Sequence, residues 1–349
     1  IPDRIGVSGI EFVEFAADEA EAAELTSLFH TLGFRRAGRH VSKDVTLFRQ
    51  RDINLVINTE REGFAHSSYL VHGTSVCAMG LKVADAKTTV ARAKALGAEL
   101  FEQPVGPGEL TIPAIRGVGG GVIHFIDQKP PLARVWDIEF VAIEDPDPPF
   151  DAGLKRIDHL GQTMNYEEML TWLLFYISIF RTQKTPMVDV IDPGGVVRSQ
   201  AIETEDGAVR LTLNGAENHR TLAGHFIAES FGASVQHLAF TTNDIFATAA
   251  VLKANGFRPL RMSQNYYDDI EARFGLDGGL TDRLKAENIL YDRDQKGEYF
   301  QLYCPTYGDG FIFEIVERRG PYRGYGAPNA SFRIAAQKRQ LLSSAELEL

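Results

Sequence analysis

Two stretches of the chain decide its fold: SVCAMGLKVADAKTTVARAKALG, residues 75–97, and SVQHLAFTTNDIFATAAVLKANG, residues 234–256. They align without a gap, and each reads as a strand of alternating polar and apolar residues followed by a helix. An aspartate, Asp85 or Asp244, stands where the helix should begin, as an N-cap does. A glycine closes each copy, as expected where a helix ends in a left-handed residue. The sequence therefore predicts an internal repeat, which sets the architecture.

Two weaker matches extend this repeat along the chain. Residues 9–34 resemble residues 156–180, again as a strand followed by an amphipathic helix. The strand-like segment GVIHFID, residues 121–127, matches GFIFEIV, residues 310–316. Each half then holds two strand–helix starts with β-rich sequence after each. We therefore expect an α+β fold built from duplicated βαβββ modules.

The segment between the halves has the composition of a linker. Residues 144–153 read EDPDPPFDAG, rich in proline and acidic residues. We therefore predict an N-terminal scaffold domain without metal, residues 1–149, and a C-terminal metal-binding domain, residues 150–349.

Composition excludes several classes of function. The 349 residues carry 36 Lys and Arg against 47 Asp and Glu, a net charge of −11 that argues against binding nucleic acid through its phosphates. The longest apolar run, residues 169–180, is shorter than the roughly 20 residues of a membrane-spanning helix. Two cysteines make no disulfide framework or zinc site. We expect a cytoplasmic homo-oligomer, and a chain that begins at Ile1 instead of Met fits a piece of a longer fusion.

Three polar residues of the second half stand opposite apolar residues of the first. The pairs are His159 with Phe12, His237 with Ala78, and Glu314 with Phe125. All three polar residues have apolar neighbours in strand-like sequence, so they are expected to face an interior. There an imidazole or carboxylate costs several kcal/mol unless it is paired or binds a metal. Two histidines and one carboxylate are the ligand set of non-haem Fe(II) oxygenases. We predict a metal site in the second half and a packed, metal-free first half.

The candidate ligand segments resemble a known family. RIDHL (156–160), SVQHLAF (234–240) and FIFEIVERRG (311–320) are similar to the metal-ligand segments of 4-hydroxyphenylpyruvate dioxygenase. Other segments follow in the same order along almost the whole chain. The resemblance implies the vicinal-oxygen-chelate fold, in which the modules form two open barrels. It also implies that His159, His237 and Glu314 bind Fe(II), or another divalent metal in its place.

The same resemblance implies a reaction and a set of substrate contacts. A 2-oxo acid chelates the metal, dioxygen is the co-substrate, and in the tyrosine catabolism of the family the products are homogentisate and CO₂. Ser199, Asn214 and Gln301 fall where the family has substrate-binding residues. The pocket departs from the family at several positions, among them Thr212, which replaces a proline, and Ala330, which replaces a phenylalanine that packs over the substrate ring. We therefore expect weak activity toward 4-hydroxyphenylpyruvate.

A second resemblance leaves the function open. Residues 213–221, 265–274, 287–303 and 324–329 look like the C-terminal half of bacterial fused 3-dehydroshikimate dehydratases. Three hypotheses follow: a dioxygenase acting on 4-hydroxyphenylpyruvate or a related aromatic substrate, a metal-binding dioxygenase-like domain beside a dehydratase with altered or no activity, and an extradiol ring-cleaving enzyme.

Overall fold

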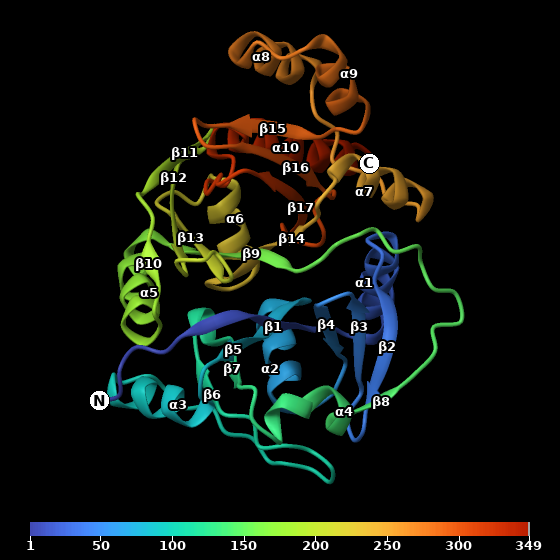
Figure 1. Cartoon of the computed structure of the whole chain (residues 1–349). Coiled ribbons are helices and arrows are strands. Elements are labelled where there is room, and N and C mark those ends of the chain that lie inside the picture. Colours follow the sequence, from blue (N-terminus) through green and yellow to red (C-terminus); the bar gives the residue numbers. More distant parts are fainter. Residues whose placement is uncertain (348–349) are drawn as a thin grey trace.

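The computed structural model describes residues 1–347 and contains two mixed sheets, one stacked on the other (Figure 1). The first sheet has eight strands in the order β6-β7-β5-β1-β4-β3-β2-β8. The second has nine, in the order β10-β12-β13-β9-β14-β17-β16-β15, with β11 paired to β12. We call residues 1–142 the first half and residues 157–347 the second half. Helices and mixed sheets together confirm the predicted α+β class.

The elements of the first half are β1 (Val7–Ala16), α1 (Glu19–Thr31), β2 (Arg35–His40), β3 (Val45–Gln50), β4 (Ile53–Asn58), α2 (Gly63–His72), β5 (Ser75–Val83), α3 (Ala86–Ala95), β6 (Ala114–Arg116), η1 (Val118–Gly120), β7 (Val122–Ile126), η2 (Leu132–Arg134), α4 (Val135–Glu139) and β8 (Phe140–Ala142).

The elements of the second half are β9 (Ile157–Asn165), α5 (Tyr166–Ile179), β10 (Gln183–Lys184), β11 (Val188–Asp192), β12 (Gly195–Glu203), β13 (Arg210–Ala216), α6 (Leu222–Glu229), β14 (Ser234–Thr241), α7 (Ile245–Ala254), α8 (Gln264–Phe274), α9 (Gly278–Ala286), β15 (Leu290–Arg293), β16 (Glu298–Tyr303), β17 (Ile312–Arg319), η3 (Ala327–Asn329) and α10 (Ala330–Leu347).

The central strands of the two sheets are arranged alike. They run β7-β5-β1-β4 in the first sheet and β17-β14-β9-β13 in the second. In both sets the middle pair is antiparallel and the two outer pairs are parallel. This likeness of topology supports the repeat inferred from the sequence.

The predicted helix ends of the repeat are confirmed. The side chains of Asp85 and Asp244 each accept a hydrogen bond from the backbone N–H three residues on, at 2.7 and 3.0 Å. Gly97 and Gly256 have positive φ angles of 87° and 90°, which the absence of a Cβ permits.

Aromatic side chains join the two halves. Because side chains alternate along a strand, Phe15 of β1 faces away from the interior of the first half and toward the second. Its ring lies 5.7 Å from that of Phe311 and 6.0 Å from that of Phe313, and Phe34 lies 5.2 Å from Phe240. One core cluster of buried residues includes residues from both halves. The predicted boundary at 149/150 falls in the connecting segment 143–156, and the division into two domains stays a prediction.

Strand pairing shows which residues of the two halves correspond. Ala239 of β14 pairs with His159 on one side and with Glu314 on the other. The corresponding residue of β5, Gly80, pairs with Phe12 on one side and with His124 on the other. The prediction that Phe125 stands opposite Glu314 is therefore wrong by one residue. Phe125 points to the other face of its strand, where it is fully buried.

The sequence predicted that the interior of the first half is packed, and this prediction is wrong. The interior contains a cavity of about 1190 Å³. Its wall is formed by β1, β4, β5 and β7 of the sheet, with α2 and α4 over it. Among residues 1–347, no helix combines the length and the apolar character that crossing a bilayer would require.

Candidate metal centre

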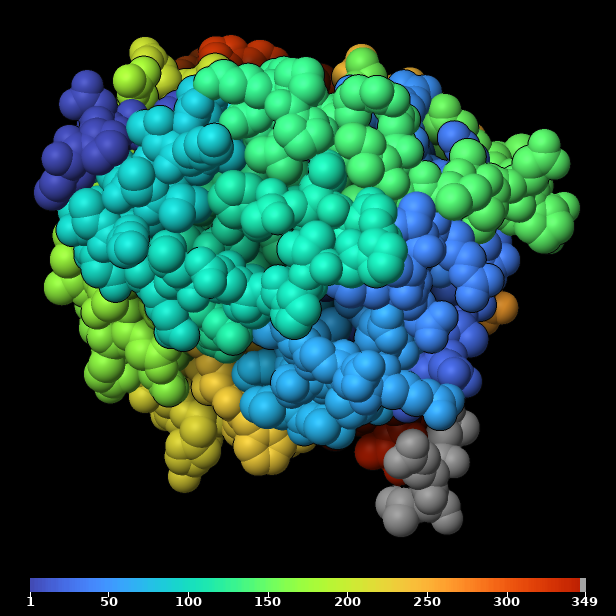
Figure 2. Space-filling view, turned by 90° about the horizontal axis from the view of Figure 1, so that it is seen from below, coloured from blue at the N-terminus to red at the C-terminus, as the bar shows by residue number. Residues whose placement is uncertain are grey.

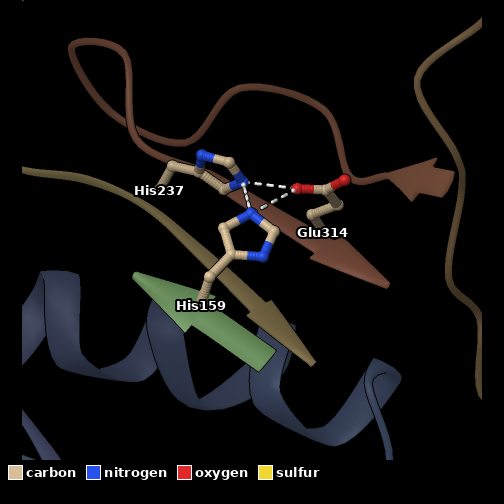
Figure 3. A group of neighbouring side chains, drawn as sticks. All are labelled: His159, His237 and Glu314. Carbon is tan, nitrogen blue, oxygen red and sulfur yellow. Dashed lines mark hydrogen bonds and ion pairs between the residues drawn. The ribbon is translucent and has the colours of Figure 1, made fainter. Parts of the chain in front are cut away.

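The three predicted ligands lie on neighbouring strands in the middle of the second sheet. His159 is on β9, His237 on β14 and Glu314 on β17. Ala239 of β14 pairs with both His159 and Glu314, and His237 precedes it by two residues, so all three ligands project from the same face. The small side chain of Ala239 leaves the space between them free. Figure 3 shows the three side chains turned toward one point above the strands.

The ligand atoms are spaced as a divalent metal would require. The Nε2 atom of His159 lies 3.1 Å from Nε2 of His237 and 3.3 Å from Oε2 of Glu314, and His237 also contacts Glu314. Three atoms at about 2.1 Å from a metal, at right angles to one another, are about 3.0 Å apart. His159 and Glu314 are each 1% exposed. In the part of the chain that the structure describes, this is the one group of at least three His, Cys, Asp or Glu side chains with such spacing.

Asp158 fixes the orientation of His159. Its Oδ2 atom accepts a hydrogen bond from Nδ1 of His159 at 2.6 Å, and its two oxygens accept further hydrogen bonds from Arg210 at 3.1 Å and from Arg318 at 2.9 and 3.0 Å. Burial opposes ionisation, but Arg318 and His159 hold the pKa of Asp158 well below its usual value. With the proton of His159 held on Nδ1, the lone pair of Nε2 faces the centre.

Gln301 supports Glu314 from the opposite side. Its Nε2 atom donates to Oε1 of Glu314 at 2.8 Å and to the hydroxyl of Tyr303 at 2.7 Å. Asn329 fixes the Gln301 amide in turn, because its own Nδ2 atom donates to Oε1 of Gln301 at 2.8 Å. One carboxylate oxygen of Glu314 is thus held by an amide, and the other faces the histidines.

The protonation states of Glu314 and His237 favour metal binding, whereas that of His159 opposes it. Burial opposes ionisation of Glu314, but His237 and His159 hold the pKa of its carboxyl far below its usual value. Burial lowers the pKa of His237, which favours the neutral imidazole. Against the effect of burial, hydrogen bonds to Asp158 and Glu314 raise the pKa of His159, so a metal must displace a proton there.

The residues predicted to bind substrate share the metal-facing side of the sheet. Ser199 and Asn214 are direct partners on β12 and β13, and both are half-buried. Thr212 pairs with Gly161 of β9, two residues beyond His159. A Cβ added to Gly161 would lie 3.1 Å from Oγ1 of Thr212 and 3.0 Å from the His237 ring. These contacts put Thr212 beside the metal ligands and Ser199 and Asn214 further along the same face.

The start of α10 brings two further residues to this region. Ala330, the predicted pocket variant, is the first residue of the helix and is half-buried. Arg333 lies one turn further on, with its guanidinium carbon 5.7 Å from the centroid of the Tyr303 ring. Arg333 donates to Gln337 at 2.6 Å and forms no ion pair with a carboxylate of residues 1–345, the part of the chain whose side chains the structure describes.

Sequence reasoning missed the residues that surround the candidate ligands, namely Asp158, Arg210, Arg318, Tyr303 and Asn329, and Arg333 at the start of α10. The one signal available was the position of Asp158, an acidic residue directly before a predicted metal-binding histidine in an apolar strand. The others come from segments far away in the chain, so only the fold brings them together.

Two family models match the chain. The family model "Hydroxyphenylpyruvate dioxygenase, HPPD, N-terminal" matches residues 2–141. A second model, "Glyoxalase/Bleomycin resistance protein/Dioxygenase superfamily", matches residues 156–283.

Similar proteins fall into two groups by length. A 3-dehydroshikimate dehydratase of Pseudomonas putida is 39% identical over 336 residues, which are 96% of this chain and 53% of that protein. A solved "xylose isomerase-like TIM barrel/4-hydroxyphenylpyruvate dioxygenase fusion protein" matches with a TM-score of 0.84 and 38% identity, over 97% of this chain and 53% of its own. The chain thus spans about half the length of these relatives.

A shorter relative matches along almost its entire length. A 4-hydroxyphenylpyruvate dioxygenase of Pseudomonas aeruginosa is 33% identical over 329 residues, which cover 93% of this chain and 92% of that enzyme. Coverage of more than nine-tenths of both chains, together with the α+β fold and the converging candidate ligands, identifies the relationship. The chain belongs to the 4-hydroxyphenylpyruvate dioxygenase family, dioxygenase-type proteins of the vicinal-oxygen-chelate superfamily.

Proposed function

We propose that the second half is a non-haem Fe(II)-dependent dioxygenase centre that acts on a 2-oxo acid of the 4-hydroxyphenylpyruvate type. The observation that carries the proposal is the convergence of His159, His237 and Glu314 at the distances of a three-ligand metal site. When bound, Fe(II) supplies the oxidative chemistry, since three ligands leave three positions open for a chelating 2-oxo acid and dioxygen.

The protein contributes orientation and an enclosed site. Asp158 keeps the proton of His159 on Nδ1, so that Nε2 is free to bind the metal. Gln301 holds one oxygen of Glu314 and leaves the other toward the centre. The ring of Tyr325 lies 5.1 Å from that of His159 and, with the buried Tyr303, keeps water away from this side.

We propose that Ser199, Asn214 and Gln301 bind the substrate. Hydroxyl and amide groups on the metal-facing side of the sheet can hydrogen-bond the ring hydroxyl and the 2-oxo acid group. With 4-hydroxyphenylpyruvate, both atoms of dioxygen enter the products, homogentisate and CO₂. Thr212 and Ala330 alter the pocket, so a ring has less to pack against, and misplacement by about 1 Å can cost on the order of a hundredfold in rate.

A second candidate function has its own support. The chain matches about half of each fused relative, and some of these carry the name 3-dehydroshikimate dehydratase. The alternative is a dioxygenase-like domain, associated with a dehydratase, that binds the metal but has altered or no activity toward 4-hydroxyphenylpyruvate.

One experiment separates the two. Oxygen uptake and homogentisate formation are measured with Fe(II) and 4-hydroxyphenylpyruvate, with His237→Ala as the matched control that lacks a ligand. Homogentisate formed in proportion to oxygen consumed, and lost in His237→Ala, supports the dioxygenase. Metal binding at one ion per chain without oxygen uptake supports the alternative.

A further inference from the structure

The cavity in the first half has no part in the function proposed above. Its volume of about 1190 Å³ slightly exceeds the roughly 300–1,000 Å³ of typical small-molecule sites. Figure 2 views the protein from the side of this half, where residues from about 40 to 145, coloured blue to green, form most of the surface.

The cavity is the counterpart of the metal centre. Phe12 corresponds to His159 and His124 to Glu314 through the paired strands described above. Both residues line the cavity. It reaches the second half at Gln162, which lies on the strand that carries His159.

Aromatic rings form much of the cavity wall. The ring of Phe12 lies 5.7 Å from that of His124 and 5.7 Å, edge to face, from that of Trp136. Phe101 meets His124 edge to face at 6.4 Å, and Arg116 stacks over Phe101 at 4.8 Å. Such walls offer a flat aromatic ring both face and edge contacts.

His124 faces this space with an unused polar atom. Its Nδ1 atom is buried and has no hydrogen-bond partner among residues 1–347. Burial lowers its pKa to about 4, so the ring is neutral at neutral pH. A buried polar atom without a partner is costly, and a neutral imidazole can accept a hydrogen bond from a hydroxyl.

Glu14 is the second polar group inside. It follows Phe12 by two residues on β1 and so projects from the same face. Its carboxyl accepts a hydrogen bond from the Cys77 thiol at 3.4 Å and has no ion-pair partner among the side chains of residues 1–345. The neighbouring cations are engaged elsewhere, Lys43 with Glu109 at 3.5 Å. Burial raises the pKa of Glu14, but a carboxyl oxygen accepts hydrogen bonds in either protonation state. A thiol is a weak donor, so the group retains capacity for a hydroxyl group.

We propose that the cavity of the first half binds a small hydroxylated aromatic compound, with its ring between Phe12, Phe101 and Trp136 and its hydroxyl groups hydrogen-bonded to Glu14 and His124. A buried carboxyl group without a cationic partner favours a neutral, hydroxyl-bearing ligand over an anion. The site is separate from the metal centre, so the proposal stands whether or not the second half is an active dioxygenase.

The chain offers its own reporter for a binding test. It has two tryptophans, Trp136 in the cavity wall and Trp172 on α5. In Trp172→Phe the remaining emission comes from Trp136. Metal-free protein, treated with a chelator, is titrated with catechol, with toluene as a ring without hydroxyls and with cyclohexane-1,2-diol as hydroxyls without an aromatic ring. We expect a saturable change with catechol, and binding about tenfold or more weaker for each comparator.

Variants in the Trp172→Phe background locate the site. Ala78 lines the cavity, so Ala78→Phe fills it and should weaken catechol binding at least tenfold. Glu14→Leu should weaken catechol binding about tenfold without weakening toluene binding. His237→Ala, in the metal centre, should change neither catechol binding nor toluene binding. Circular dichroism checks that each variant is folded. If Ala78→Phe does not fold, Glu14→Leu and His124→Phe are used in its place, and both should weaken catechol binding.

Three results would overturn the proposal. They are no saturable signal with catechol, toluene binding as tightly as catechol, and catechol binding that His237→Ala abolishes while Glu14→Leu leaves it unchanged.

Discussion

Replacing Asp158 with asparagine is the sharpest test of how the metal centre is built. The change keeps the size of the side chain and removes its charge. In the native protein this carboxylate accepts hydrogen bonds from His159 at 2.6 Å, from Arg210 at 3.1 Å and from Arg318 at 2.9 and 3.0 Å. An asparagine has one acceptor oxygen, so its NH₂ group must face an imidazole N–H or a guanidinium, neither of which accepts a hydrogen bond.

Two separate losses follow from this geometry. Breaking a buried ion pair by removing one partner costs about 3–5 kcal/mol of unfolding free energy. That is a large share of the roughly 5–15 kcal/mol by which proteins are stable. Without its carboxylate partner, His159 is also free to turn, and loss of such a partner typically lowers metal affinity about 10–100-fold.

Urea unfolding of the metal-free protein and competition with a metal chelator measure the two losses independently. Asp192→Asn is the matched control, because Asp192 is also buried, pairs with Lys338 at 2.9 Å and accepts from Gly194 at 2.7 Å, but does not touch the ligands. The control should lose stability and keep its metal affinity. An Asp158→Asn protein that binds metal as tightly as the wild type, or an equal loss of affinity in the control, would refute the reasoning.

Four further predictions concern single residues. His237→Ala should lower the metal content of protein reconstituted with Fe(II) from one ion per chain to none, measured by atomic absorption, whereas His124→Ala should leave it unchanged. Burial lowers the pKa of His124 to about 4 in the folded protein. As the pH falls, the imidazole is therefore protonated in the unfolded chain before it is protonated in the folded one. Stability should therefore fall by about 2–3 kcal/mol between pH 6.5 and about 4, and His124→Phe should remove that part of the pH dependence in urea unfolding. Arg333→Leu should raise the KM for an anionic 2-oxo acid about tenfold while changing kcat less, with partial rescue by Arg333→Lys in steady-state assays. Ala330→Phe should increase homogentisate formation in single-turnover experiments, and an unchanged yield would show that this position does not contact the ring.

The three candidate metal ligands could be proposed from the sequence because the chain carries an internal comparison. The histidines stand out because their counterparts are apolar, Ala78 for His237 in the gapless repeat and Phe12 for His159 in the weaker match. The third pairing shows the limit of that comparison. GVIHFID and GFIFEIV both begin with glycine, so they align naturally on it and place Phe125 opposite Glu314. The strand register shifts the match by one residue to His124, and with a period of two this moves the side chain to the other face.

What surrounds the ligands could not be predicted, because it depends on contacts distant in sequence. Asp158 meets Arg318 across 160 residues, and Gln301 meets Asn329 across 28. The cavity of the first half was missed for the same reason. The apolar pattern of the strands predicts which face is buried, but whether helices fill that space or leave it open depends on how they cross the sheet.

The aromatic contact between the halves has a consequence for any attempt to divide the protein. Phe15 and Phe34 of the first half pack against Phe313 and Phe240 of the second, inside a core that both share. A fragment that begins near residue 150 would expose this surface to water, and exposed apolar patches of that kind promote aggregation. The second half is therefore a poor candidate for recombinant expression by itself, and shortened versions of this protein should keep both halves in one polypeptide.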